Sequence, residues 1–306
     1  MCTAVYLKCS GLFGRTLDFE RGFGEEVVVT PREYMTMGEA KNRYAIIGAG
    51  VVNEKNVFYF DGMNEFGLCG GALNFPGYAV YPGSEDKTNI PSGILLGFVL
   101  GFCRSISQVR EMLSRVGIIG EEFLGIPPTP LHWIFADKTG AITIESTERG
   151  LEVIDNPYGV LTNAPNFSYH TTRLGDYMAL HSGFPENRGE DERTVYSRGM
   201  GAIGLPGDFS SVSRFVRSVF VKENSISAGG DNGRLNQMRH ILSSVSIPLG
   251  CVRTDKGEAV STRYTSIMDS ENLTYHFYSY ENPCLKSLKL KPENPDMEVF
   301  PLYVSE

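Results

Sequence analysis

The residue with the most distinctive chemistry is Cys2, which directly follows the initiator methionine in Met1-Cys2-Thr3. Removal of Met1 would place the thiol of Cys2 beside a free α-amine. An α-amine has a reference pKa of roughly 7.7–8.0, so it can act as the base for its own side chain. Cys2 could therefore supply both the nucleophile and the base of a hydrolytic reaction. The alternative is a cysteine that follows the start codon by chance, and these three residues alone leave both interpretations open.

Two charged residues, Arg15 and Asp18, are placed to support such a nucleophile. Residues 3–8 are predicted to form a strand and residues 9–11 a turn, so the returning strand carries Arg15 back past Cys2. A guanidinium near the thiol would favour the thiolate, and a carboxylate could hold the α-amine in position. An ordinary ion pair within a hairpin is the alternative interpretation.

Other residues that commonly assist a cysteine nucleophile show no comparable pattern. None of the five histidines lies in a recognisable cysteine–histidine peptidase motif. The six cysteines lack C-x-x-C spacing, so the sequence predicts reduced thiols rather than a disulfide framework or a zinc site. A redox pair of Cys2 and Cys9 across the hairpin is a further alternative, but nothing else in the chain resembles a thiol oxidoreductase.

The composition excludes several classes of function. The chain has 306 residues, 42% of them hydrophobic and 21% charged, which is enough to bury a large core. Because the formal net charge is −8 and no run of Lys or Arg exceeds a pair, no nucleic acid partner is expected. The most apolar stretch, residues 94–102, is too short to cross a bilayer. The N-terminus lacks the pattern of a secretion signal, so we expect a cytoplasmic protein that has no membrane partner.

The elements that must position these residues alternate between sheet and helix. Apolar residues with a period of two predict strands, and apolar residues at helical spacing predict helices. The predicted strands are residues 3–8, 26–30, 44–52, 57–60, 68–73, 131–136, 141–146, 151–155, 160–163, 262–268, 273–280 and 287–290. The predicted helices begin near residues 91, 107, 167, 210 and 235. Residues 61–67 are predicted to form a turn, and residues 131–155 a second sheet region.

This order of sheet, helices, sheet, helices and sheet predicts a layered α+β fold. Sheets are expected to pack on each other, with helices on the outer faces. Parallel strands are less expected because the hairpin connections are short. The chain has neither an internal repeat nor a linker-like segment, so residues 1–306 are expected to form a single domain.

Six motifs occur in an order and spacing that resemble a known family. They are Met1-Cys2-Thr3, Leu12-Phe13-Gly14-Arg15-Thr16-Leu17-Asp18-Phe19-Glu20, Asp61-Gly62-Met63-Asn64-Glu65, Leu73-Asn74-Phe75-Pro76, Leu161-Thr162-Asn163 and Gly204-Leu205-Pro206-Gly207-Asp208-Phe209-Ser210. Over nearly its whole length the chain resembles the choloylglycine hydrolase family, that is, the conjugated bile salt hydrolases and penicillin V acylases of the N-terminal nucleophile superfamily. The resemblance implies a four-layer αββα sandwich that uses no cofactor and no metal.

The resemblance also implies a set of site residues. The implied catalytic residues are Cys2, Arg15, Asp18, Asn74, Asn163 and Arg214. The Cys2 thiolate would attack the amide carbon, and its α-amine would pass a proton to the leaving nitrogen. The Asn74 side chain and a backbone N–H would stabilise the oxyanion, and Asp18 would hydrogen-bond the α-amine. Arg214 lies off the apolar face of its helix, so it serves the site only if that polar side borders the cleft, and is otherwise a solvated arginine.

Asn74 also bears on the substrate. Family members that cleave bile salts typically have asparagine in this motif, whereas the best-known penicillin V acylases have tyrosine. The resemblance therefore favours conjugated bile salts, whose apolar steroid needs a wide hydrophobic opening; Phe19, Phe60 and Leu131 are the candidates for it. Arg198 lies in a segment that varies within the family and would favour glycine over taurine, although it also has an ordinary interpretation as a surface residue.

Several alternatives and one assembly state follow from the same resemblance. The alternative activities are an acylase for penicillin V or N-acyl homoserine lactones, and a catalytically silent lipid-binding relative. The complete set of site residues disfavours the silent relative. Because the family is commonly tetrameric, a homotetramer is expected, with residues 182–196 as the candidate for subunit contacts.

Overall fold

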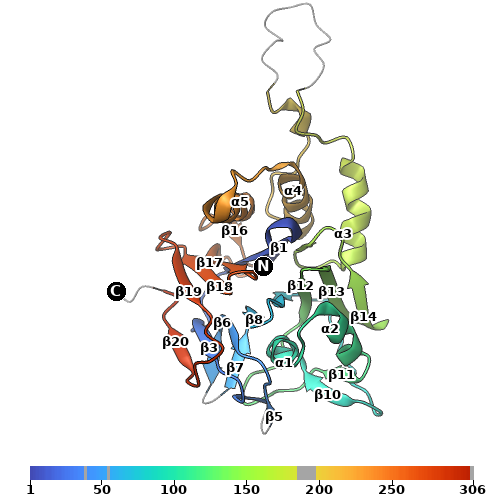
Figure 1. Cartoon of the computed structure of the whole chain (residues 1–306). Coiled ribbons are helices and arrows are strands. Elements are labelled where there is room, and N and C mark those ends of the chain that lie inside the picture. The colour runs from blue at the N-terminus through green and yellow to red at the C-terminus, as the bar shows by residue number, and fades with distance from the viewer. Residues whose placement is uncertain (38–39, 54–55, 185–197, 304–306) are drawn as a thin grey trace, which may run out of the picture.

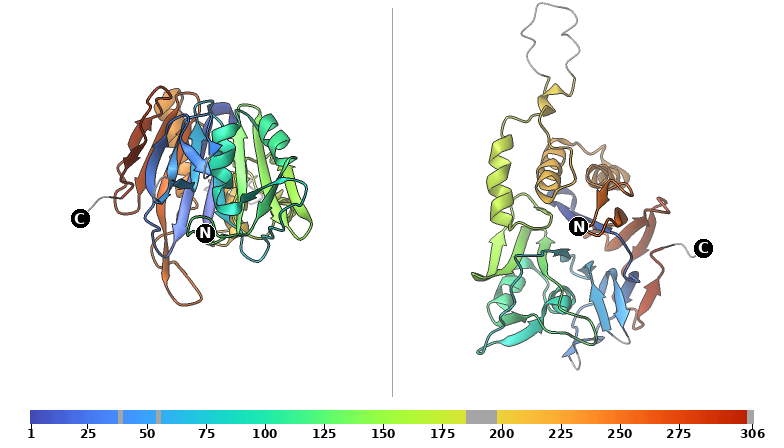
Figure 2. Two further views of the ribbon diagram at one scale, coloured as in Figure 1. Left: turned by 90° about the horizontal axis from the view of Figure 1, so that it is seen from below. Right: turned by 180° about the vertical axis from the view of Figure 1, so that it is seen from behind.

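The computed structural model describes residues 1–37, 40–53, 56–184 and 198–303. Its strands form two large sheets that stack face to face, and helices cover both outer faces (Figure 1). The same four layers are visible from below and from behind (Figure 2). The predicted α+β sandwich is therefore confirmed.

The first large sheet holds the N-terminal strand. In the described residues its order is β15-β1-β2-β17-β18-β19, with β16 paired to β17. These strands are β15 (Val160–Leu161), β1 (Cys2–Leu7), β2 (Leu12–Phe19), β17 (Ala259–Asp269), β18 (Thr274–Ser279), β19 (Lys286–Lys289) and β16 (Val252–Arg253). The β1–β2 hairpin is antiparallel and places Cys2 opposite Leu17 and Ala4 opposite Arg15. Strands from the beginning, middle and end of the chain thus lie side by side around Cys2.

The second large sheet packs against the first. Its order is β14-β13-β12-β9-β8-β6-β3-β20, with β7 paired to β6. These strands are β14 (Gly150–Asp155), β13 (Gly140–Thr147), β12 (Leu131–Asp137), β9 (Cys69–Asn74), β8 (Asp61–Asn64), β6 (Ile46–Asn53), β3 (Glu26–Thr30), β20 (Glu298–Phe300) and β7 (Asn56–Tyr59). Strands β1 and β2 contact β9, so the N-terminal hairpin lies directly over this sheet.

Helices cover the two outer faces. The first sheet is covered by α4 (Ser211–Asn224) and α5 (Gly230–Ser243), and the second by α1 (Leu95–Phe102) and α2 (Ile106–Leu113) (Figure 1). The N-cap residue Ser210 accepts a hydrogen bond from the Ser213 N–H, which starts α4 as the sequence predicts. Gly14 allows α5 to approach β2, because a Cβ there would lie 2.7 Å from Leu242. Helix α3 (Phe167–Leu174) packs beside α4.

The remaining elements are short. The strand pairs are β10 (Thr88–Pro91) with β11 (Val116–Ile119), and β4 (Met35–Met37) with β5 (Ala40–Lys41). The 3₁₀ turns are η1 (Lys8–Ser10), η2 (Ser92–Ile94), η3 (Gly175–Tyr177) and η5 (Met200–Ala202). No helix in the described ranges has both the length and the hydrophobicity needed to cross a membrane.

Some sequence predictions of local structure were wrong. Residues 61–67 were predicted as a turn because of their glycine and asparagine, but residues 61–64 form the buried strand β8 between β6 and β9. The meander of residues 131–155 continues the sheet of β9 instead of starting another. Strands β10 and β11 are parallel, and β20 was not predicted. Periodicity indicates which face of a strand is buried, but it does not indicate which strands pair.

Candidate active site

Cys2 is the first residue of β1, and its side chain is buried between the two sheets. Arg15 on the neighbouring strand donates from Nη2 to the Cys2 sulfur at 3.2 Å and from Nη1 to the Phe60 carbonyl at 2.6 Å. Burial opposes the charge of Arg15, but the facing atoms of Tyr264, Cys2 and Asp61 raise its pKa above the ordinary value. A permanently charged guanidinium therefore lies against the thiol, as the hairpin predicts.

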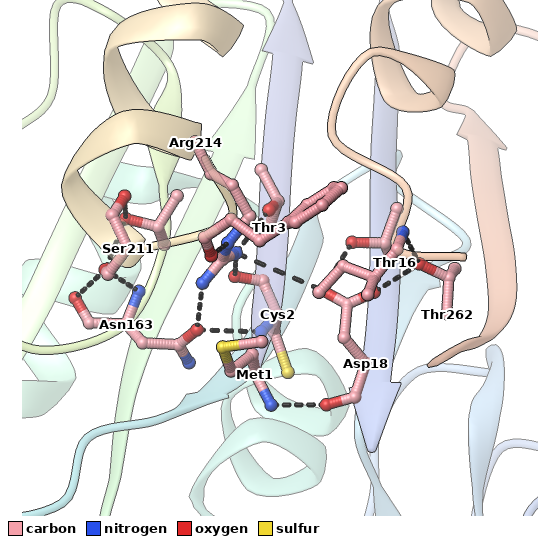
Figure 3. Close-up of polar contacts among 12 residues, drawn as sticks. Met1, Cys2, Thr3, Thr16, Asp18, Asn163, Ser211, Arg214 and Thr262 are labelled. Carbon is pink, nitrogen blue, oxygen red and sulfur yellow. Dashed lines mark hydrogen bonds and ion pairs between the residues drawn. The ribbon is translucent and has the colours of Figure 1, made fainter. Parts of the chain in front are cut away.

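Arg15 and Asp18 lie on opposite faces of the first sheet. They are three residues apart in β2, and side chains alternate between the faces of a strand. Arg15 points toward the second sheet, whereas the Asp18 carboxylate lies 4.0 Å from Arg214 of α4. Its other partners are the hydroxyls of Thr16 at 3.2 Å and Thr262 at 2.6 Å, which both donate to it (Figure 3).

Asp18 and Arg214 form a buried pair on the helix side of the sheet. Burial raises the pKa of Asp18, although Arg214 opposes this shift. Burial likewise lowers the pKa of Arg214, and Asp18 opposes that shift. Each charge therefore depends on the other for compensation.

Asn163 connects the remaining site residues. Its Oδ1 accepts hydrogen bonds from the Cys2 N–H and from Arg214 Nη2, each at 2.8 Å (Figure 3). Its Nδ2 donates to the main-chain carbonyl of Asn74 at 2.8 Å. The structure thus brings Asn163 and Asn74 together, and Asn74 is also one of the residues that line a cavity beside the Cys2 sulfur.

Arg214 is fully buried and faces β1 rather than solvent. Its Nη1 donates to the Cys2 carbonyl at 2.5 Å and to the Thr3 hydroxyl at 2.6 Å, and its Nε donates to the Phe209 carbonyl at 3.0 Å. The condition set by the sequence, that the polar side of this helix borders the site, is therefore met.

Met1 is present and extends the hairpin by one pair. Its α-amine donates to the Asp18 carbonyl, and the Asp18 N–H donates to the Met1 carbonyl at 2.8 Å (Figure 3). Burial lowers the pKa of this α-amine, Cys2 and Asp18 oppose the shift, and Arg214 and Arg15 add to it. The nitrogen of Cys2 is a peptide nitrogen in this form and contacts Asn163, not the Asp18 carboxylate.

A cavity of about 360 Å³ opens beside the sulfur. Cys2, Arg15 and Asn74 lie at its wall, and most of its remaining lining is apolar. Phe23 packs edge to face on Phe19 and on Phe60, with ring centroids 4.9 and 5.8 Å apart. The predicted lining residues Phe19, Phe60 and Leu131 all line the cavity. Arg198 is exposed in the turn before η5 and is not among the lining residues.

Residues 2–300 match the family described as linear amide C-N hydrolases, choloylglycine hydrolase family. The chain belongs to this family. It is 40% identical to the "Bile salt hydrolase/transferase" of Lactiplantibacillus plantarum, over 97% of this chain and 94% of that protein. It is 36% identical to the protein of the same description from Clostridium perfringens, again over 97% of this chain and 94% of the relative.

Two solved structures have the same fold as this chain. The crystal structure of a mutant conjugated bile acid hydrolase from Clostridium perfringens superposes with a TM-score of 0.88 at 33% identity, covering 100% of this chain and 99% of the other. A penicillin V acylase from Agrobacterium tumefaciens superposes with a TM-score of 0.77 at 20% identity, covering 98% and 90% of the two chains. The second likeness concerns the fold alone.

In this member of the choloylglycine hydrolase family, Ser211 and His170 also contact a site residue, the main chain of Asn163. The sequence patterns did not predict these two residues as part of the site. The Asn163 N–H donates to Ser211 Oγ at 2.9 Å, and Ser211 Oγ donates to the Asn163 carbonyl at 2.9 Å. His170 Nε2 lies 2.8 Å from the same carbonyl. Burial lowers the pKa of His170 to about 4, so its ring is neutral at pH 7. The available signal was the spacing of Ser211 and Arg214, which places them on one face of a helix.

Three further residues, Asp61, Tyr264 and Tyr275, lie behind Arg15 and were also missed. Asp61 belongs to a motif that had been interpreted as a turn, and the tyrosines lie in strands far along the chain.

Proposed function

We propose that this protein hydrolyses the amide bond of glycine- or taurine-conjugated bile salts. The observation that carries the proposal is the position of the Cys2 sulfur, 3.2 Å from Arg15 Nη2 and at the wall of a largely apolar cavity. Such a cavity can bury a steroid while the scissile amide lies at the sulfur. The printed names of relatives at 40% and 36% identity support the same substrate class.

The proposed reaction begins after removal of Met1. The Cys2 sulfur forms a bond to the amide carbon, and the carbonyl electrons move to the oxygen, where the Asn74 side chain and a backbone N–H stabilise them. The α-amine of Cys2 accepts the thiol proton and donates it to the leaving nitrogen as the C–N bond breaks. Glycine or taurine leaves, and water hydrolyses the thioester to release the bile acid and restore the thiol.

The neighbouring residues have supporting roles in this proposal. Arg15 favours the thiolate, because its guanidinium contacts the sulfur. Asn163 orients the nitrogen of Cys2, and Arg214 holds both Asn163 and the Cys2 carbonyl. Asp18 compensates the charge of Arg214.

The decisive experiment measures glycine or taurine release together with the intact mass. The active protein is expected to be one methionine lighter than the encoded chain, and full activity with Met1 retained would refute the mechanism. Cys2→Ala should abolish release, whereas Cys9→Ala, at an exposed thiol, should retain it. Retained hydrolysis by Cys2→Ala would exclude Cys2 as the nucleophile. The alternative of a redox pair is wrong, because Cys9 lies in η1, beyond the opposite end of the extended strand β1 from Cys2, and so outside disulfide reach.

A penicillin V acylase is the second candidate. A penicillin V acylase from Pectobacterium atrosepticum is 25% identical over 76% of this chain and 62% of that protein, so the reaction type is shared with a more distant relative. Glycocholate, taurocholate, penicillin V and an N-acyl homoserine lactone should be compared at equal concentration. A higher kcat/KM for penicillin V or the lactone would replace the bile salt assignment, and binding without turnover would identify a silent relative.

We also infer that residues 1–306 fold as one domain, because β1 pairs with β15 and β2 with β17. A homotetramer is proposed from exposed apolar side chains on both sides of residues 185–197. These are Met178, Phe184, Met200 and Ile203. The predicted contact segment, residues 182–196, lies largely outside the described residues. Light scattering on the purified protein tests this assembly, and a monomeric mass would refute it.

A cytoplasmic location is proposed from the cysteines. All six lie among the described residues and are unpaired, as is usual in a reducing compartment. Fractionation of the source cells tests the proposal, and recovery of the protein outside the cell would contradict it.

A further inference from the structure

A buried carboxylate lies behind Arg15, on the side away from the Cys2 sulfur. Arg15 Nη1 is 3.3 Å from Asp61 Oδ2, while Nη2 of the same guanidinium contacts the sulfur at 3.2 Å. The side chain of Asp61 has no exposed surface and does not line the cavity. Asp61 therefore cannot touch a substrate there, but it contacts the group that touches the thiol.

Two tyrosines clamp this carboxylate. Tyr264 donates its hydroxyl to Asp61 Oδ2 and Tyr275 donates to Oδ1, each at 2.6 Å. Burial raises the pKa of both phenols well above the ordinary value, with Asp61 adding to the shift, so both remain donors. A buried carboxylate needs such partners, because an unpaired buried charge is costly.

The clamp also joins the two sheets. Asp61 belongs to β8 of the second sheet, whereas Arg15, Tyr264 and Tyr275 belong to β2, β17 and β18 of the first. A guanidinium is planar and rigid, so the position of Nη1 determines that of Nη2. The distance between the cation and the sulfur is thus set from across the interface of the sheets.

We propose that Asp61, held by Tyr264 and Tyr275, is a positioning residue that determines how much of the Arg15 charge acts on the Cys2 thiol. This inference rests on the proposed role of Cys2 as the nucleophile. One guanidinium is shared between two anionic groups, the carboxylate and the thiolate. When the Asp61 carboxylate attracts the Arg15 guanidinium more strongly, less positive potential remains at the sulfur. When it attracts the guanidinium less strongly, more positive potential remains there.

Other ionisable groups also act on the thiol. They are the N-terminal amine beside Cys2, Arg214 at the Cys2 carbonyl, and Asp18 beside Arg214. These lie on the main-chain or helix side, whereas Asp61 acts through Arg15 on the cavity side. Substitutions at Asp61 and Tyr275 leave the direct contacts of the helix-side groups in place.

The test uses two substitutions whose expected effects have opposite signs. Asp61→Asn removes the competing charge, so the pH midpoint of Cys2 alkylation should fall by about one unit. Tyr275→Phe removes one donor from the carboxylate, which strengthens its hold on Arg15, so the midpoint should rise by several tenths of a unit. Alkylation by iodoacetamide is followed as the mass gain of the N-terminal peptide, which separates Cys2 from the exposed Cys9, Cys251 and Cys284. All proteins are used as purified, with removal of Met1 checked by mass.

Tyr278→Phe is the matched control. This tyrosine lies in the same strand as Tyr275, three residues further on, where its ring faces Arg239. The pH midpoint of Cys2 alkylation in Tyr278→Phe should equal that of the wild type. If Asp61→Asn does not fold, the upward shift in Tyr275→Phe alone supports the proposal.

Two results would overturn the proposal. The first is an alkylation midpoint that is unchanged in either variant when that variant is folded. The second is a shift of the same sign in both variants, which a nonspecific loss of packing around the site would produce. Glycocholate hydrolysis gives a separate readout, for which we expect kcat to fall about tenfold in Asp61→Asn with KM within about twofold, because Asp61 lies outside the cavity. If the wild type does not hydrolyse bile salts but the midpoints shift as expected, the substrate assignment fails and this inference stands.

Discussion

Replacing Arg214 by glutamine should affect stability and catalysis together. The substitution removes a buried cation that donates to the Cys2 carbonyl, the Thr3 hydroxyl and Asn163 Oδ1. It also leaves the buried Asp18 carboxylate without its cation, 4.0 Å away. Loss of one partner from a buried pair typically costs about 3–5 kcal/mol. Since domains are commonly stable by about 5–15 kcal/mol, the variant should fold at 25 °C but unfold at a clearly lower urea concentration.

The catalytic effect should be larger than the loss of stability alone would produce. Without Arg214, both Asn163 and the first residue of β1 lose an anchor, so the sulfur and the nitrogen of Cys2 shift relative to the substrate. A displacement of about 1 Å can cost roughly 100-fold in rate. We therefore expect kcat for glycocholate to fall by about two orders of magnitude under conditions where the variant is folded.

Arg217→Gln provides the comparison. Arg217 lies in the same helix and is also buried, but it donates to the carbonyls of Ser244, Pro206 and Asp208 and not to the site. Its replacement should lower the urea midpoint while kcat stays within a few fold of the wild type. Equal kcat values for the two variants, or a loss of less than about 1 kcal/mol in Arg214→Gln, would refute the assigned role of Arg214.

Three further outcomes are expected. His170 alone should remove about 2 kcal/mol of stability between pH 7 and pH 5, because its pKa falls from 6.5 to about 4 on folding and the unfolded chain takes up the proton first; the urea midpoint of His170→Phe should therefore fall less over this range than that of the wild type, and an equal fall in both proteins would contradict this contribution. Ser211→Ala should destabilise the protein by about 1–3 kcal/mol and lower kcat with little change in KM, because the main chain of Asn163 loses a partner outside the cavity; an unchanged kcat would contradict this role. Phe23→Ala should raise KM for glycocholate about 5- to 30-fold with a smaller effect on kcat, because about 1–2 kcal/mol of apolar contact is lost; an unchanged KM would place the steroid elsewhere.

The sequence predicted which residues form the site better than it predicted which face of the sheet each side chain occupies. The hairpin correctly brought Arg15 to Cys2, and the family motifs supplied Asn163 and Arg214 at positions that meet at β1. The three-residue spacing of Arg15 and Asp18 already implied opposite faces of the strand, which separates the cavity side from the helix side.

Asp61 shows why the rest could not be predicted. Aspartate and glycine favour turns locally, and only the pairing of β8 with β6 and β9 makes residues 61–64 a buried strand. The tyrosines that clamp Asp61 lie 203 and 214 residues away in the sequence. Local patterns carry no information about contacts at such separations.

The first residues of the chain acquire their surroundings from its distant parts. The nitrogen of Cys2 meets a partner 161 residues away and its carbonyl one 212 residues away. Contacts of such long range form slowly, because a large loop must close before any of them is gained. During synthesis the N-terminus is thus without these partners until most of the chain has left the ribosome. This interval gives an aminopeptidase access to Met1 before burial, and it delays assembly of the reactive thiol until the fold that controls it is nearly complete.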